Sequence, residues 1–212
     1  MYLKEIWRYP VKSMAGERLR EAELRADGIA GDRTVLAVDA RGRVHTARRH
    51  SRLLGMHATM GPSGEPVVDG RDWRDPDVQA RVEAATALGV RLVRYDEPER
   101  FDILPLLITT DGALAAFGRD HRRLRPNLVI GGVEGLAERE WEGRRLRVGE
   151  AIIHAVDLRG RCIMTTFDPD TLTQDVHVLR DIAERFGGTF GLNTAVERPA
   201  TIREGDPVEL LA

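Results

Sequence analysis

Arg161-Cys162-Ile163-Met164-Thr165-Thr166-Phe167-Asp168-Pro169-Asp170, residues 161–170, is the stretch around which the rest of this sequence is organised. It contains the single cysteine of the 212-residue chain, so this thiol has no partner for an internal disulfide. Free cysteine is among the most often buried residues, and a small core side chain is one interpretation of Cys162. The arginine directly before it supports another, because nearby positive charge favours the thiolate that acts as a nucleophile or binds a metal.

The sequence on either side of this stretch shows two regular patterns. Before it, residues 151–158 alternate apolar and polar side chains, which predicts a half-buried strand. After it, Val176, Leu179, Ile182 and Ala183 recur at helical spacing and predict a helix that ends at Gly187-Gly188. The stretch itself is therefore expected to form a loop between a strand and a helix.

The N-terminal half reads mainly as short strands. Residues 2–9 alternate and stop at Pro10, and residues 34–38 form a β-branched apolar run. Residues 39–42, Asp-Ala-Arg-Gly, form a hairpin turn signal, and residues 44–47 are expected to be the returning strand. Residues 60–75 are rich in Gly, Pro and Asp, which predicts a loop with at most one short strand at residues 66–69.

Further strands and two helices complete the pattern. Residues 77–88 predict a helix stopped by Gly89, and residues 90–95 another strand. A strand within residues 101–109 is followed by Thr110 or Asp111 as the N-cap of a short helix through Phe117. Many short strands with few helices predict a β-rich α+β fold, a barrel with small peripheral helices. The charged residues 96–100 are the nearest thing to a boundary, and divide the chain into residues 1–95 and 96–212, packed as one unit.

Composition limits the classes of function. With 42% hydrophobic residues, 31% charged residues and a formal net charge of -2, the chain is predicted to be an ordinary globular protein. This balance does not favour a nucleic-acid or anionic membrane partner. No secretory signal is recognised, and no apolar run reaches the roughly 18 residues of a membrane span. Together with the single cysteine, these features predict a cytoplasmic protein.

Several common catalytic motifs are missing from the sequence. It contains neither the glycine-rich dinucleotide fingerprint nor the phosphate-binding loop motif. The six histidines are not spaced in the short pairs that zinc sites use, and a single cysteine makes a structural zinc improbable. His154 is the histidine closest in sequence to Cys162, which is weak support for a cysteine protease.

Basic residues instead gather near predicted strand ends. Lys12-Ser13 follows the first strand, Asp32-Arg33 precedes another, Arg125-Pro126-Asn127 opens a third, and Arg161 adjoins the thiol. Arginine offers a planar fork of donors to phosphate, and lysine and serine add a point charge and a hydroxyl. Each segment alone is better explained by a surface ion pair or a turn cap. Together they predict a site for an anion that carries phosphate.

The order of these segments resembles the MOSC-domain proteins, in the branch that includes the mitochondrial amidoxime-reducing component and its bacterial relatives. The 161–170 stretch is the most specific part of the resemblance. The motifs that carry it span nearly the whole chain: Tyr9-Pro10-Val11-Lys12-Ser13, Gly31-Asp32-Arg33, Thr46-Ala47-Arg48, Leu124-Arg125-Pro126-Asn127, Glu138 with Trp141, Gly160-Arg161-Cys162, Phe190-Gly191-Leu192-Asn193 and Gly205-Asp206.

The resemblance implies a MOSC-type β-barrel that binds the molybdenum cofactor, molybdenum held by molybdopterin, with Cys162 as the thiolate ligand to the metal. Thiolate is a soft ligand, which suits this role. By motif match, the residues that would hold the pterin and its phosphate are Lys12, Ser13, Arg33, Arg125, Asn127 and Arg161. The resemblance also assigns Thr110, Asp111 and Asn193 to the cofactor site. This assignment rests on the pattern of the residues around them rather than on identity with the family's own residues. Pyridoxal phosphate is not an expected cofactor.

The function implied is the reduction of N-hydroxylated compounds, N-OH or N-oxide, as small-molecule substrates. The 212 residues include no recognisable iron-sulfur segment, so electrons are expected from a separate protein of ferredoxin-like, flavin reductase or cytochrome type. Met14 stands where many relatives have cysteine, and the segment between Thr59 and Phe101 is shorter than in the mitochondrial proteins. Two alternatives stay open: a carrier or insertion protein for the molybdenum cofactor, and a sulfur carrier with a persulfide on Cys162.

Overall fold

The structure, a computed structural model, describes residues 1–211. The strands are β1 (Tyr2–Arg8), β2 (Glu17–Leu19), β3 (Glu21–Arg25), β4 (Gly28–Ile29), β5 (Val35–Val38), β6 (Val44–His45), β7 (Ala58–Met60), β8 (Pro66–Val68), β9 (Arg71–Asp72), β10 (Arg91–Arg94), β11 (Leu106–Thr110), β12 (Leu128–Gly131), β13 (Arg145–Val148), β14 (Ala151–Gly160), β15 (Thr189–Arg198), β16 (Ala200–Arg203) and β17 (Val208–Leu210). The α-helices are α1 (Pro76–Ala85), α2 (Asp111–Phe117) and α3 (His177–Phe186), and the 3-10 helices are η1 (Ser51–Gly55), η2 (Pro98–Arg100), η3 (His121–Arg123), η4 (Ala137–Trp141) and η5 (Ile163–Thr166).

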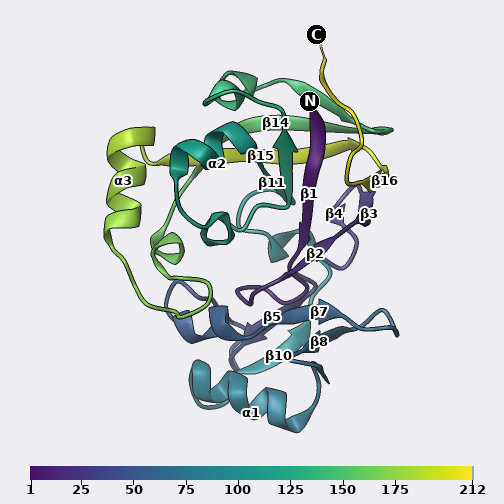
Figure 1. Ribbon diagram of the computed structural model, residues 1–212. Coiled ribbons are helices and arrows are strands. Elements are labelled where there is room, and N and C mark those ends of the chain that lie inside the picture. Colours follow the sequence, from purple (N-terminus) through teal and green to yellow (C-terminus); the bar gives the residue numbers. More distant parts are fainter. Residues whose placement is uncertain (212) are drawn as a thin grey trace.

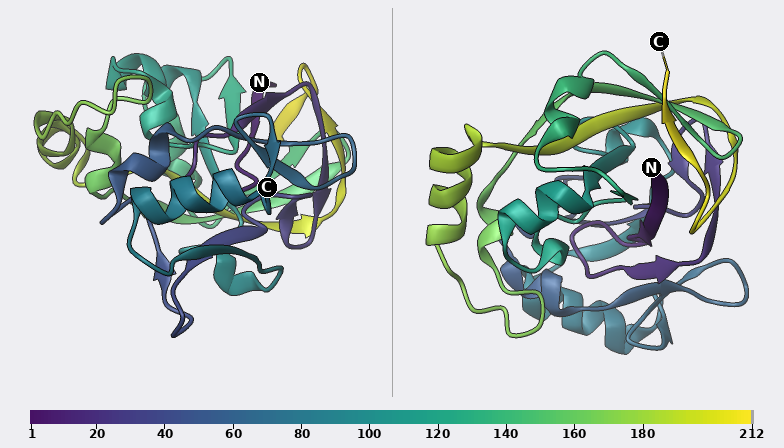
Figure 2. Two further views of the ribbon diagram at one scale, coloured as in Figure 1. Left: turned by 90° about the horizontal axis from the view of Figure 1, so that it is seen from below. Right: turned by 45° about the horizontal axis from the view of Figure 1, so that its top comes forward.

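Eight strands form the main sheet in the order β17-β13-β14-β15-β11-β12-β1-β2. Its longest strands are the antiparallel pair β14 and β15, with ten residues in each strand. β11 and β12 run parallel, which requires a crossover connection, and α2 with η3 supplies it. A bridge between Tyr2 and Pro207 joins the start of β1 to the residue before β17, so the sheet curls toward a barrel (Figures 1 and 2).

Two small sheets, β10-β5-β6 and β7-β8-β9, lie with α1 in the lower part of Figure 1. Their buried side chains form a second core around residues such as Val35, Leu53 and Val82. Met164 and Phe167, from the 161–170 stretch, pack against this core although the adjoining β14 belongs to the main sheet. The stretch therefore connects the two parts of the molecule.

Several strands are recognisable in the sequence because buried apolar and exposed polar side chains alternate along them. In β3, Ala22 and Leu24 are buried in the main core, whereas the residues between them are exposed. The strand-rich architecture with three α-helices confirms the predicted β-rich α+β class. Across residues 1–211, no helix is both long enough and apolar enough to cross a membrane.

Helix predictions were confirmed with shifted ends. α1 begins one residue before the predicted start, and the Asp75 side chain accepts the Asp77 N–H at 2.8 Å as its N-cap. It ends at Ala85, earlier than expected, because the Thr86 hydroxyl bonds the Val82 carbonyl at 2.6 Å and the chain leaves the helix there. α3 ends at the left-handed Gly187, as its glycine pair predicted.

Two strand predictions were wrong in extent. The returning strand of the first hairpin covers Val44–His45 only, because Thr46 starts a turn in which its carbonyl accepts the Arg49 and His50 N–H groups. The segment predicted as a loop with at most one strand contains both β8 and β9, which pair with each other and with β7. Strands of two or three residues are too short to show periodicity in the sequence.

Candidate functional site

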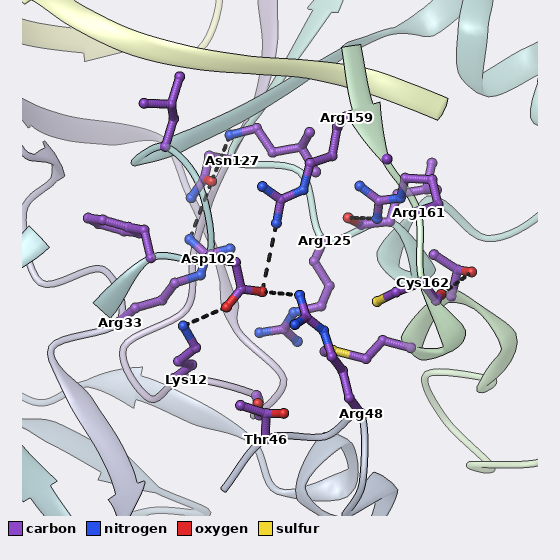
Figure 3. Close-up of a pocket in the computed structure, with 18 of the residues that line it drawn as sticks. Lys12, Arg33, Thr46, Arg48, Asp102, Arg125, Asn127, Arg159, Arg161 and Cys162 are labelled. Carbon is purple, nitrogen blue, oxygen red and sulfur yellow. Dashed lines mark hydrogen bonds and ion pairs between the residues drawn. The ribbon is translucent and has the colours of Figure 1, made fainter. Parts of the chain in front are cut away.

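A pocket with a cavity volume of about 100 Å³, partly open to solvent, lies between the two parts of the molecule beside Cys162. Its wall is strongly basic. The described residues that line it include seven cationic side chains, those of Lys12, Arg33, Arg48, Arg123, Arg125, Arg159 and Arg161, and one carboxylate, that of Asp102 (Figure 3).

Segments at strand ends deliver these side chains. Lys12 follows β1, Arg33 precedes β5, and Arg125 precedes β12. Arg161 and Cys162 follow β14, where the Arg161 N–H donates to the Gly188 carbonyl at 3.0 Å. Irregular backbone at the end of a rigid strand can direct a side chain out of the sheet, so these segments place their charged groups in the pocket.

Backbone strain is concentrated at this pocket. Ser13, Arg33 and Arg125 have positive φ angles of 73°, 55° and 55°, although none is glycine. Such left-handed residues cost about 1–3 kcal/mol each and occur preferentially at functional sites. Of the five non-glycine residues in this conformation among residues 1–211, these three line the pocket.

Arg125 and Arg161 are partly buried cations, and each has a buried donor atom without a partner in the described structure. The Arg125 guanidinium lies 4.2 Å from the Tyr9 ring centre, and the Arg161 Nη2 donates to the Leu124 carbonyl at 2.6 Å. Within the described chain, Arg125 Nη2 and Arg161 Nε are buried without a hydrogen-bond partner. Burial lowers the pKa of each guanidinium to about 10. Buried donors left unpaired are costly, so these groups are suited to an anionic ligand.

Asp102 occupies the middle of the pocket, between three cations (Figure 3). Its carboxylate oxygens lie 2.7 Å from Lys12 Nζ, 2.8 Å from Arg48 Nη2 and 3.8 Å from Arg159 Nη2. Burial alone would raise the pKa of Asp102, but Lys12 and Arg48 hold that pKa below its usual range. Burial also lowers the pKa of Lys12, against the influence of Asp102.

Arg48 links this carboxylate to the thiol. Burial opposes its charge, but Asp102 and the adjacent Cys162 side chain together raise the pKa of Arg48. Cys162 is partly exposed, and its carbonyl accepts the Thr165 N–H at 3.0 Å at the start of η5. The sulfur is therefore accessible from the pocket and has a guanidinium beside it.

Asn127 and Asp32 form a buried support behind Arg33. The Asn127 Nδ2 donates to Asp32 Oδ2 at 3.1 Å, and its Oδ1 accepts the Leu107 N–H at 3.1 Å. Asp32 also pairs with the Arg33 guanidinium and accepts the Tyr9 N–H at 2.7 Å. Because most of the bonding capacity of Asn127 is used internally, this residue holds the pocket together as much as it lines it.

Most residues proposed from the sequence meet in this pocket. Those that line it are Lys12, Ser13, Arg33, Arg125, Asn127, Arg161 and Cys162. The Ser13 hydroxyl accepts the Ala47 N–H at 3.0 Å, which fixes the loop that carries Arg48. What these residues bind stays a prediction at this point.

Thr110, Asp111 and Asn193 lie outside the pocket wall in the described structure. Thr110 caps α2 by accepting the Ala113 N–H at 3.1 Å, and Asp111 accepts the Gly132 N–H at 2.9 Å. The pocket is at the other end of β11, where Leu106 and Leu107 line it. Asn193 acts from behind the wall, because its Oδ1 accepts from Arg159 Nη1 at 2.9 Å.

Four charged wall residues were missed by the sequence reasoning: Arg48, Asp102, Arg123 and Arg159. Arg48 lies in the Thr46-Ala47-Arg48 motif, and Arg159 lies two residues before Arg161. The position of each in the sequence could therefore have indicated a place in the pocket wall. Asp102 had none, since it follows a charged turn that resembles an ordinary solvated loop.

Comparison with known families identifies the class of protein. The MOSC N-terminal beta barrel domain matches residues 1–100, and the MOSC domain matches residues 113–209. The chain belongs to the MOSC-domain proteins, as its motifs predicted, and its fold is of the MOSC type. This membership supports a function associated with the molybdenum cofactor.

Individual relatives are more distant. The chain is 28% identical to the mitochondrial amidoxime-reducing component 1 of Homo sapiens over 278 residues, covering 98% of this chain and 82% of the relative. It is 27% identical to the mitochondrial amidoxime reducing component 2 of Homo sapiens, covering 96% of this chain and 82% of the relative. Because these alignments are longer than the 212-residue chain, the relatives carry insertions relative to it.

Among solved structures, the chain is similar to the YUAD protein from Bacillus subtilis, with a TM-score of 0.49, 14% identity, and coverage of 98% of this chain and 93% of that one. YiiM from Escherichia coli has a TM-score of 0.44 and 16% identity, with coverage of 97% of this chain and 70% of that one.

Proposed function

We propose that this chain binds the molybdenum cofactor in the basic pocket and reduces N-hydroxylated compounds. One observation carries the proposal: a thiol and seven cationic side chains converge on one pocket, in which two arginines have buried donor atoms without a partner in the described structure. A phosphate-bearing ligand with a soft metal combines the groups that such a pocket can satisfy. The relatives that share 23–28% identity with the chain are named amidoxime-reducing components.

The residues divide between two tasks. Cys162 would ligate molybdenum through its sulfur, with Arg48 beside it to balance the charge. The phosphate and the polar edges of the pterin would be held by Lys12, Ser13, Arg33, Arg125, Asn127 and Arg161. Arg125 and Arg161 would donate their unpaired N–H groups to the ligand. These new hydrogen bonds would remove the free-energy cost of leaving buried donors unpaired.

When bound, the cofactor would supply the two electrons needed to break an N–O bond. The balanced reaction is R–N–OH plus two electrons and two protons, giving R–N–H and water: the N–O bond breaks, one N–H bond forms, and the departing hydroxyl takes the other proton. The chain's own residues would hold and orient the cofactor, as proteins do for most redox cofactors. The solvent-open side of the pocket, beside the partly exposed Cys162, would admit the substrate.

Electrons would come from a separate protein, of ferredoxin-like, flavin reductase or cytochrome type. The cytoplasm stays our predicted compartment, whereas the named relatives are mitochondrial proteins. Cell fractionation with an antibody to the chain would decide between the two compartments.

The test is metal content followed by turnover. The chain would be purified from a molybdenum-replete host and, as a control, from a host unable to make the cofactor. We expect stoichiometric molybdenum in the first preparation only, and reduction of benzamidoxime with an artificial electron donor. Stoichiometric molybdenum without turnover would instead support a cofactor carrier. Absence of molybdenum with sulfane sulfur on Cys162 would support a sulfur carrier.

A further inference from the structure

The carboxylate of Asp102 is an unexpected feature of a pocket suited to anions. It is the single carboxylate among the described wall residues, and it is bound to Lys12 and Arg48 at 2.7 and 2.8 Å. Two other wall cations have partners outside the wall, because Arg33 pairs with Asp32 and Arg123 with Asp168. Asp102 therefore supplies the negative charge that the centre of the pocket would otherwise lack.

The segment that carries Asp102 is fixed at both ends and irregular between them. On one side, Arg100 is buried and donates to the Asp27 and Asp32 carbonyls at 3.0 and 3.2 Å. On the other side, Leu106 is buried at the start of β11. The intervening residues 101–105 belong to no helix or strand, and Ile103 is 56% exposed.

The Asp102 carboxylate is held by ion pairs to the surrounding cations. The side chain is 29% exposed, and its contacts in the described structure are the ion pairs to Lys12, Arg48 and Arg159. An anion that bound the same cations would remove the interactions that keep this carboxylate in the pocket. It would also be repelled by the carboxylate, because like charges a few ångströms apart in a partly desolvated site repel strongly.

We propose that Asp102 is the resident counter-anion of the pocket, which an incoming phosphate group displaces from Lys12 and Arg48. The ligand must then compete with the Asp102 carboxylate for the same cations. Only an anion that binds these cations more strongly can displace it, so the pocket favours multiply charged anions over chloride and other monovalent ones. This inference rests on the proposed function only in taking phosphate as the ligand's anchoring group. It requires neither the metal nor catalytic turnover.

Asp102→Asn tests the proposal, because it keeps the shape of the side chain and removes its charge. The probe is inorganic phosphate, titrated by calorimetry at low ionic strength into the cofactor-free full-length chain. We expect the variant to bind phosphate at least about tenfold more tightly than the wild type, and to bind chloride where the wild type does not. We also expect the variant to unfold at a lower temperature without phosphate and to regain more stability when phosphate is added.

Asp96→Asn is the matched control, since Asp96 pairs with Arg94 outside the pocket. It should leave phosphate affinity unchanged. Equal or weaker phosphate binding by Asp102→Asn would overturn the proposal and make Asp102 a fixed support for the cations. Phosphate binding by neither protein would overturn it as well.

A crystal structure of the wild-type chain with phosphate gives a second measurement that does not depend on a variant. We expect the Asp102 carboxylate to lie beyond the roughly 4 Å limit of an ion pair from Lys12 Nζ. A carboxylate that stays in place beside bound phosphate would contradict displacement. Failure of the proposed function is measured separately, by the molybdenum content of the protein from a molybdenum-replete host.

Discussion

Arg125 should lower the stability of the free chain and strengthen the binding of its ligand. Replacing it with methionine allows both effects to be measured. Methionine has a similar length and no charge, so Arg125→Met removes the buried guanidinium without opening a large cavity. Arg125 now contributes an unpaired Nη2 and lies over the Tyr9 ring at 4.2 Å. The structure therefore predicts opposite effects on the free and the ligand-bound chain.

The magnitude for the free chain follows from burial. Burial lowers the pKa of Arg125 to about 10, because the folded state disfavours the charged guanidinium. Below that pH Arg125 is charged, so the whole of this cost lowers the free energy of unfolding. A lowering of this size corresponds to roughly 3 kcal/mol. The cation–ring contact, worth about 0.5–2 kcal/mol, offsets part of that cost. We expect the methionine variant, measured by urea unfolding at pH 7, to be about 1–2 kcal/mol more stable than the wild type.

The magnitude for the ligand follows from the lost donor. A hydrogen bond to a charged group contributes about 1.5–3 kcal/mol, so phosphate affinity should fall by about tenfold to a hundredfold. Molybdenum occupancy of protein from a replete host should fall with it. Arg122→Met is the control, because Arg122 pairs with Asp120 and Asp170 outside this pocket. A variant that is no more stable than the wild type, or that keeps wild-type phosphate affinity, would contradict these expectations.

Two other substitutions test internal polar contacts, one behind the pocket and one away from it. Asn127→Ala should lower the free energy of unfolding by about 2–4 kcal/mol even without ligand, because it leaves the Leu107 N–H without a partner and removes one of the hydrogen bonds to Asp32. A loss below about 1 kcal/mol in urea unfolding would show that Asn127 is not structural. Glu5→Gln tests the hydrogen bond with His121 at 3.0 Å, which lowers the pKa of Glu5 to about 2. A lowered carboxyl pKa stabilises the fold above the unfolded value of 4.5 and loses that effect as pH falls toward 2. The variant should therefore be about 1–2 kcal/mol less stable at pH 7 and show a flatter pH dependence between 5 and 2, and parallel wild-type and variant curves would contradict this.

The sequence predicted the fold class because strands of four residues or more left a recognisable pattern, either alternation, as in β3, or an apolar run, as in β5. β3 and β14 each bury alternate residues, and that pattern is visible without coordinates. No such pattern was visible for β9, whose two residues pair with β8 across a short turn. Hydrogen bonding between strands leaves no periodic trace in segments this short.

The site was predictable where a motif lay at a strand end, as at Arg125 and Cys162. It was not predictable where a residue's role depends on its neighbours in space. Thr110 is a polar residue at a strand end that caps a helix instead of reaching the pocket. Asp102 reaches the pocket from an irregular segment, and its importance comes from Lys12 and Arg48, which are far from it in sequence.

The central claim is that the Cys162 sulfur binds molybdenum. Molybdenum X-ray absorption would be compared between the wild type and Cys162→Ser, both purified from the same molybdenum-replete host. We expect the variant to keep most of its molybdenum, because several other residues hold the cofactor, yet to lose a sulfur neighbour from the metal and to lose turnover. An unchanged sulfur coordination, or wild-type turnover in the variant, would contradict the account.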